Sequence, residues 1–191
     1  MDRPLGRSSG VNDAVVDRPA AVELPGKPAA DSFESLYERT FERVYAYAAS
    51  LLRDRAAAED VTAQAFERAY RKRRRYRASR GSAEAWLFGI VRNAALDELR
   101  RRKRRASLHG DPKSEDHEAP VDFAERAIRR ETLRGALATL TAVERDIVAL
   151  KFAGGLTNAE IARVLRTSES NAGTRLHRTM TKLREACHDD V

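Results

Sequence analysis

The chain has 191 residues, a net charge of +7 and a single cysteine, Cys187. One cysteine excludes a disulfide within the chain, and no apolar run reaches the roughly 18 residues of a membrane span. The N-terminus lacks the apolar core of a secretory signal peptide, so we expect a cytoplasmic protein. Residues 71–105 hold fourteen Lys or Arg and three acids, a local charge of +11, which leaves −4 for the remainder. Such a block favours nucleic acid over a membrane surface, which would require a lipid-facing amphipathic helix.

Residues 1–30 contain four of the six prolines and no hydrophobic period, which predicts a disordered tail. From Asp31 or Ser32, apolar residues recur at steps of three and four to about residue 52, which predicts an amphipathic helix. A break at Arg53–Arg55 precedes a second predicted helix over residues 55–72. Its polar face is either a protein-docking surface or an ordinary solvated one. That face carries Glu59, Asp60, Gln64 and Glu67.

A basic loop and a long helix follow. Six basic residues surround Tyr76 between Arg71 and Arg77, which suits single-stranded nucleic acid, because cations follow phosphates and rings stack on exposed bases. A solubilising linker is the alternative. Residues 81–105 predict one helix with Ser82 as N-cap, an apolar stripe that includes Trp86, and six consecutive basic residues at its end. This helix either lies on a polyanion or packs in a core with a solvated basic end.

Residues 106–124 carry five acids against one lysine, two prolines and no period, which predicts a flexible acidic linker. We therefore expect an all-α fold of two small helical domains, over residues 31–105 and 125–187. His109, Asp116 and His117 lie close together in the linker, but without helical geometry or further ligands we expect no metal site. We also expect no cofactor.

The C-terminal part predicts a helix-turn-helix. Capping boxes at Thr141 and Thr157 open two helices, and Ser168 caps a last helix whose outer face is polar and basic. A short capped helix, a tight turn and a longer helix make the helix-turn-helix pattern, in which the start of the second helix meets base edges. Asn171 suits adenine, and Arg175 and Arg178 suit guanine or phosphate. A structural helical hairpin is the alternative.

Taken in order, residues 56–70, the basic loop, residues 82–105 and residues 156–185 resemble the extracytoplasmic-function class of bacterial sigma factors. The likeness covers roughly residues 32–105 and 125–185. It implies a protein that directs RNA polymerase core to promoters and promotes strand opening, with no catalysis of its own. The implied partners are the β′ clamp helices and β flap of polymerase, promoter DNA and an anti-sigma protein.

The resemblance also implies a role for each set of residues. The surface docking on polymerase is implied at Glu59, Asp60, Gln64 and Glu67. Recognition of the −10 element and melting are implied at Arg74, Arg75, Tyr76, Arg77, Ser79, Arg80, Trp86, Arg92, Asn93, Asp97 and Arg100. Recognition of the −35 element is implied at Glu169, Ser170, Asn171, Thr174, Arg175 and Arg178. The acidic linker matches the segment that threads the RNA path of polymerase.

The chain departs from the family pattern at three places. Ala63 and Gln64 stand where a Gln followed by an acid is frequent. Arg166 stands where the helix-turn-helix turn usually has Gly. Ala172 and Gly173 replace a common Val-Lys pair, so no −35 sequence preference follows.

Two other functions fit parts of the pattern. A helix-turn-helix repressor or activator would need a ligand-binding or dimerising N-terminal domain, and residues 71–105 are too basic for a ligand pocket. A DNA-processing enzyme would need paired carboxylates, a metal-spaced His/Cys set or a phosphate-cradling Gly loop, none of which the sequence contains.

Overall fold

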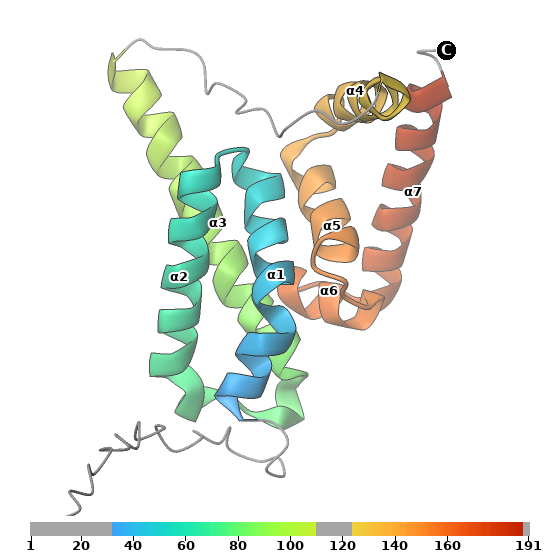
Figure 1. Ribbon diagram of the computed structural model, residues 1–191. Coiled ribbons are helices and arrows are strands. Elements are labelled where there is room, and N and C mark those ends of the chain that lie inside the picture. The colour runs from blue at the N-terminus through green and yellow to red at the C-terminus, as the bar shows by residue number, and fades with distance from the viewer. Residues whose placement is uncertain (1–31, 110–123, 189–191) are drawn as a thin grey trace, which may run out of the picture.

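The computed structural model describes the backbone of residues 32–109 and 124–188, and the side chains of residues 32–107 and 131–188. These ranges fold into seven α-helices in two groups (Figure 1). The first group contains α1 (Phe33–Leu52), α2 (Arg55–Lys72) and α3 (Ala83–His109). The second contains α4 (Ala124–Ala138), α5 (Ala142–Phe152), α6 (Asn158–Leu165) and α7 (Glu169–His188). The predicted all-α fold with two helical domains is confirmed.

Side-chain caps explain where these helices begin. The Ser32 hydroxyl accepts from the Ser35 N–H at 3.1 Å, and the Asp54 carboxylate accepts from the Ala57 N–H at 3.0 Å. Ser82 caps α3 by accepting from the Ala85 N–H at 3.1 Å. Thr141 and Thr157 each form the predicted capping box, with Glu144 and Glu160 as its acids. Each cap satisfies N–H groups that the first helical turn leaves without a partner.

The long helix α3 extends four residues beyond its predicted end at residue 105. Its basic tail is partly neutralised from within the fold: Arg102 pairs with Asp54 at 2.8 Å and with Glu98 at 3.1 Å, and Arg101 pairs with Glu98 at 2.6 Å. These pairs lower the repulsion between successive cations. Residues 106–109 therefore belong to a helix rather than to the linker, while the predicted tail and residues 110–123 lie outside the described residues.

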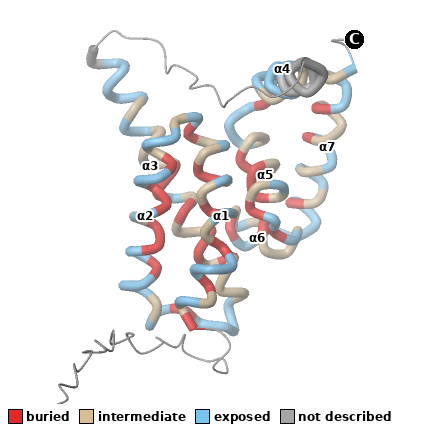
Figure 2. The backbone as a smooth tube through the Cα atoms, in the orientation of Figure 1, coloured by how far each residue is buried: buried red, intermediate tan, exposed pale blue. Residues whose placement is uncertain are grey.

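The two helix groups share one buried core (Figure 2). Val44 of α1 and Phe88 of α3 belong to the same apolar cluster as Leu150 of α5 and Ile161 of α6, and none of the four exceeds 0% exposure. Contacts between α1 and α5 and between α3 and α6 form the interface between the two helix groups, which we call the interdomain joint. A separate small cluster of Ala136, Leu140 and Leu183 holds α4 on α7. The domains are thus packed on one another rather than merely tethered.

Candidate nucleic-acid interface

One stripe of α3 gathers four of the residues assigned to the −10 element. Trp86, Asn93, Asp97 and Arg100 follow one another at steps of seven, four and three, which places them on the same side of the helix over about 21 Å. Asn93, Asp97 and Arg100 are exposed, and Trp86 is half-buried. Arg100 pairs with Asp97 at 2.8 Å. The stripe offers an aromatic ring, an amide and a paired cation to an extended ligand.

The basic segment before α3 forms two short 3-10 turns, η2 (Arg73–Arg75) and η3 (Ala78–Arg80). Its assigned side chains are exposed, except for one aromatic residue, and no described acid pairs with its arginines. These exposed residues are Arg74, Arg75, Arg77, Ser79 and Arg80. Guanidinium groups at a surface that have no acidic partner are suited to phosphate.

Tyr76 differs from expectation. The sequence predicted a ring that stacks on exposed bases, whereas the structure leaves Tyr76 only 3% exposed. Its hydroxyl donates to the Gly81 carbonyl at 3.0 Å, and its ring centroid lies 5.6 Å from that of Trp86. Tyr76 is therefore a positioning residue for Trp86, because a base cannot reach a ring that the fold covers.

Arg92 also differs from the rest of its set, because it faces the other domain. Its Nε lies 2.6 Å from Oδ2 of Asp146, a carboxylate of α5 that is 3% exposed. The Tyr47 hydroxyl donates to Oδ1 of the same carboxylate at 2.7 Å. Burial and the neighbouring Asp146 charge raise the pKa of Tyr47 well above its usual value, so the phenol stays protonated and donates.

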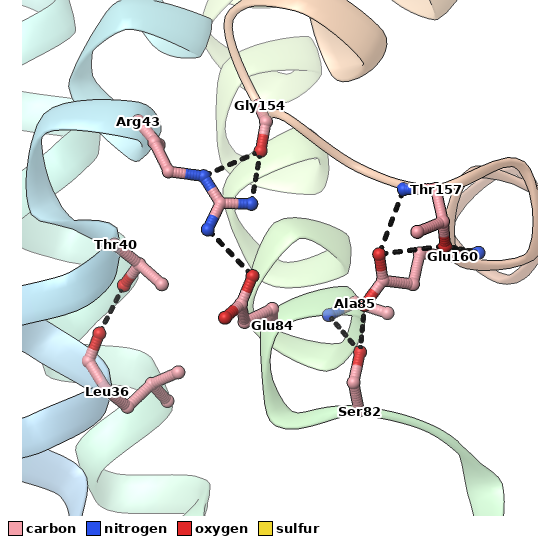
Figure 3. A network of polar contacts seen from close by, with 9 residues as sticks. All are labelled: Leu36, Thr40, Arg43, Ser82, Glu84, Ala85, Gly154, Thr157 and Glu160. Carbon is pink, nitrogen blue, oxygen red and sulfur yellow. Dashed lines mark hydrogen bonds and ion pairs between the residues drawn. The ribbon is translucent and has the colours of Figure 1, made fainter.

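A second polar network crosses the same joint (Figure 3). Arg43 of α1 donates through Nε to the Gly154 carbonyl at 2.9 Å and pairs with Glu84 of α3 at 2.8 Å. The Ser82 hydroxyl donates to Glu160 of α6 at 2.6 Å. Burial alone would raise the pKa of Glu160, but the hydrogen bonds from Ser82 and Thr157 outweigh it, so this pKa is lowered and the carboxylate stays charged.

A cavity of about 510 Å³ lies between the basic segment and α6. Trp86 and Asn93 line it from α3, and Arg163 and Arg166 line it from the helix-turn-helix. Gly81 permits the close approach: it has φ +133°, and a Cβ there would lie 2.2 Å from a guanidinium nitrogen of Arg163. The structure thus brings two arginine clusters, distant in sequence, to one opening.

The helix α2, which carries the predicted acidic face, lies on the side of the first bundle that is remote from α5–α7 (Figure 1). Asp60, Gln64 and Glu67 share one face at steps of four and three. Glu59 pairs with Arg55 at 2.9 Å and Glu67 with Arg71 at 2.6 Å, whereas no described cation pairs with Asp60. The negative charge of Asp60 is therefore not offset by an ion pair with a described side chain.

All six residues assigned to the −35 element are exposed on α7. Ser168 caps the helix by accepting from the Asn171 N–H at 3.2 Å, and the Asn171 amide donates to the Thr167 hydroxyl at 2.7 Å. Arg175 has no acidic partner among the described side chains. Arg166, in place of the usual turn Gly, adopts the left-handed conformation with φ 56° and ends α6. The turn geometry is therefore kept without glycine.

Sequence reasoning missed the residues of the interdomain joint, above all Arg43, Asp146 and Arg163. One signal was present: Asp146 stands four residues before Leu150 and directly before Ile147, at a core-facing position of α5. An acid at such a position indicates a buried partner. The identity of that partner depends on packing between segments about fifty and a hundred residues away.

Comparison with known proteins agrees with these features. The family described as Sigma-70 region 2 matches residues 36–105, and that described as Sigma-70, region 4 matches residues 130–183. The ECF RNA polymerase sigma factor SigK of Mycobacterium ulcerans is 29% identical over 195 residues, covering 96% of this chain and 97% of that protein. The SigK protein of Mycolicibacterium vanbaalenii is 30% identical over 163 residues, covering 82% of each chain.

Solved structures share the fold. The sigma factor RpoE of Bartonella quintana, solved in complex with the anti-sigma factor NepR, matches with a TM-score of 0.69 at 22% identity, over 83% of this chain and 98% of that chain. CnrH, solved with the cytosolic domain of CnrY, matches with a TM-score of 0.62 at 20% identity, over 83% of this chain and 89% of that one.

A helix-turn-helix joined to a bundle that carries a cationic, aromatic helix defines a DNA-binding transcription factor of two modules. More narrowly, the chain belongs to the ECF class of RNA polymerase sigma factors. It is a promoter-directing initiation factor, and the repressor alternative is not favoured. Within the described ranges, no helix is both long enough and apolar enough to cross a membrane.

Proposed function

We propose that the chain divides promoter recognition between α3 with its preceding basic segment and the N-terminal half of α7. On this proposal residues 31–105 dock on polymerase, read the −10 element and open the strands, and residues 125–187 read the −35 element. The observation that carries it is the stripe of α3 that aligns half-buried Trp86 with exposed Asn93, Asp97 and Arg100, an arrangement suited to unpaired bases. The protein acts in the cytoplasm and performs no catalysis.

Strand opening on this proposal is driven by differential binding. Trp86 stacks on a displaced base, and the arginines of the basic segment follow the phosphates of the separated strand. Base–aromatic stacking contributes about 1–3 kcal/mol per base, which offsets the few kcal/mol needed to unpair it. Buried Tyr76 holds Trp86 in place through the ring contact described above.

The acidic face of α2 supplies the polymerase contact on this proposal. The charge that Asp60 keeps supports docking on the clamp helices of polymerase, and the second domain meets the β flap. Because RpoE, a sigma factor of the same fold, was solved with the anti-sigma factor NepR, we include an anti-sigma protein among the proposed partners.

Run-off transcription with core polymerase on a genomic fragment library, with and without this protein, tests the proposal. New transcripts from defined start sites are expected only when the protein is present. Trp86→Ala should keep polymerase binding and lose opening, which pre-melted templates should restore. Arg175→Ala should weaken promoter choice on duplex and pre-melted templates alike. Wild-type behaviour of both variants would contradict the residue assignments.

A further inference from the structure

We propose that the cavity between the basic segment and α6 binds a nucleoside polyphosphate, with arginines of both domains on its phosphates and Trp86 on its base. The cavity holds about 510 Å³, which is in the range of small-molecule sites. Six arginines and no acid stand among the residues that line it. A cationic cavity of this size fits a small polyanion, a ligand that the proposed function does not include.

The charges around the cavity are not balanced by the protein. Five of the six arginines have no acidic partner among the described side chains. They are Arg75, Arg77 and Arg80 of the first domain and Arg163 and Arg166 of the second. The sixth, Arg92, pairs with Asp146 at 2.6 Å. Guanidinium groups that face one another across a cavity repel, and an anion between them replaces that repulsion with attraction.

The backbone at Gly81 brings the two sets of arginines together. A Cβ at this position would collide with the guanidinium group of Arg163, so only glycine lets this side chain of α6 approach the basic segment next to Arg80. Guanidinium groups bind phosphate oxygens through paired N–H groups. A chain of two or three phosphates offers enough oxygens to contact arginines from both domains at once.

Two residues of α3 supply contacts for the rest of such a ligand. Trp86 lines the cavity, and its ring is backed by that of Tyr76, with the two centroids 5.6 Å apart. Asn93 lines the same cavity about 10 Å further along the helix, where its exposed amide can bond to the polar edge of a nucleoside. An indole ring and an amide favour a ligand with a planar base over inorganic phosphate.

The test uses the full chain without polymerase or DNA, and the probe is mant-GTP, which is GTP with a fluorophore on its ribose. Fluorescence anisotropy of the probe measures its affinity. Because Trp86 is the only tryptophan in the chain, quenching of tryptophan emission by unlabelled GTP reports contact with the base. Inorganic tripolyphosphate has the phosphate chain without a base, so it should displace mant-GTP but leave the emission of Trp86 unchanged.

The double variant Arg163→Gln/Arg166→Gln removes the arginines of the second domain from the cavity and should weaken mant-GTP binding about tenfold or more. Neither residue belongs to the sets proposed for promoter recognition. Arg104→Gln/Arg184→Gln is the matched control, because it removes the same charge from two exposed positions that do not line the cavity. Its affinity should stay within about twofold of that of the parent chain.

Equal weakening in the control would indicate general charge attraction and would overturn the inference. Unchanged binding in Arg163→Gln/Arg166→Gln, binding of GTP without quenching of Trp86, or no saturable binding by the parent chain would overturn it too. The run-off assay separates this failure from that of the proposed function. If mant-GTP binds as expected but no run-off transcript appears, the ligand site stands and the proposed function fails. If run-off proceeds without mant-GTP binding, the proposed function stands alone.

Discussion

The surface of α7 that we propose reads the −35 element is exposed at all six assigned positions, whereas α3 packs on α6 along one side and reaches α5 through Arg92. Arg175 has no acidic partner among the described side chains, while Arg92 is paired to a buried carboxylate of the other domain. The two surfaces proposed to bind DNA thus differ in how far other parts of the fold contact them.

The comparison depends on the shared core, and disrupting that core should give the largest effect. Leu150→Ala removes a fully buried side chain from the cluster that joins both domains, and we expect a loss of about 3–5 kcal/mol in the free energy of unfolding. Leu183→Ala, in the small α4–α7 cluster, should cost about 2 kcal/mol. Denaturant unfolding monitored by Trp86 fluorescence measures both. Equal losses would contradict a core that extends across the domains.

Features set by nearby residues could be predicted from the sequence. The bounds of α2, the N-caps at Ser82 and Ser168 and both capping boxes follow from contacts three residues apart, which a sequence displays directly. The helix-turn-helix was recognisable for the same reason.

Features set by distant residues could not be predicted. The continuation of α3 beyond residue 105 depends on Arg102 reaching Asp54 at the turn between α1 and α2. The burial of Tyr76 depends on how the basic segment folds back towards Trp86 and Gly81. The joint at Asp146 requires side chains from three helices and both domains to meet. The hydrophobic periodicity of a sequence does not predict these contacts, because they arise from tertiary packing.

Truncating an exposed side chain on α7 should weaken promoter recognition without changing the stability of the fold. Arg175→Ala should lower transcription from a −35-dependent promoter about tenfold, corresponding to the 1–3 kcal/mol of a guanidinium contact to a base or phosphate. The unfolding free energy should stay within about 0.5 kcal/mol. Arg184→Ala is the control, since it removes an exposed arginine nine residues further along α7, on the opposite side of the helix. A similar loss in both would indicate general charge attraction rather than a reading contact.

The acids of the two capping boxes, Glu144 and Glu160, make stability depend on pH, and only Glu160 also contacts the first domain. The pKa of Glu144 is lowered chiefly by the Thr141 N–H, while Glu160, also lowered, receives in addition the Ser82 hydroxyl from the other domain. A lowered folded-state pKa stabilises the fold above the usual value of 4.5 and loses that stabilisation as pH falls through the folded value.

Glu160→Gln and Glu144→Gln should therefore each cost about 1 kcal/mol at pH 7, and the difference from wild type should vanish towards pH 3. Guanidinium unfolding at pH 7, 4 and 3 measures this. Only Glu160→Gln should also reduce energy transfer between a dye at position 56 of α2 and a dye at position 188 of α7, because only Glu160 bonds across the interdomain joint. An equal reduction of the energy transfer in Glu144→Gln would contradict the assignment of Glu160 to the interdomain joint.

The smallest effect concerns two arginines with left-handed backbones, one in each domain. Arg53 ends α1 with φ 49°, and Arg166 ends α6 with φ 56°. Glycine at either position relieves about 1 kcal/mol of backbone strain but adds entropy to the unfolded chain, so Arg53→Gly should gain only about 0.5 kcal/mol in the free energy of unfolding. Arg166→Gly should gain more than Arg53→Gly, because it also removes a guanidinium that faces Arg75, Arg77 and Arg80 across the cavity.

Urea unfolding in low salt and again in high salt separates the two contributions. The extra gain at Arg166 should shrink as salt screens the repulsion, whereas the gain common to both variants should not. Equal gains for Arg53→Gly and Arg166→Gly at both salt concentrations would mean that Arg166 is not measurably repelled by the arginines across the cavity.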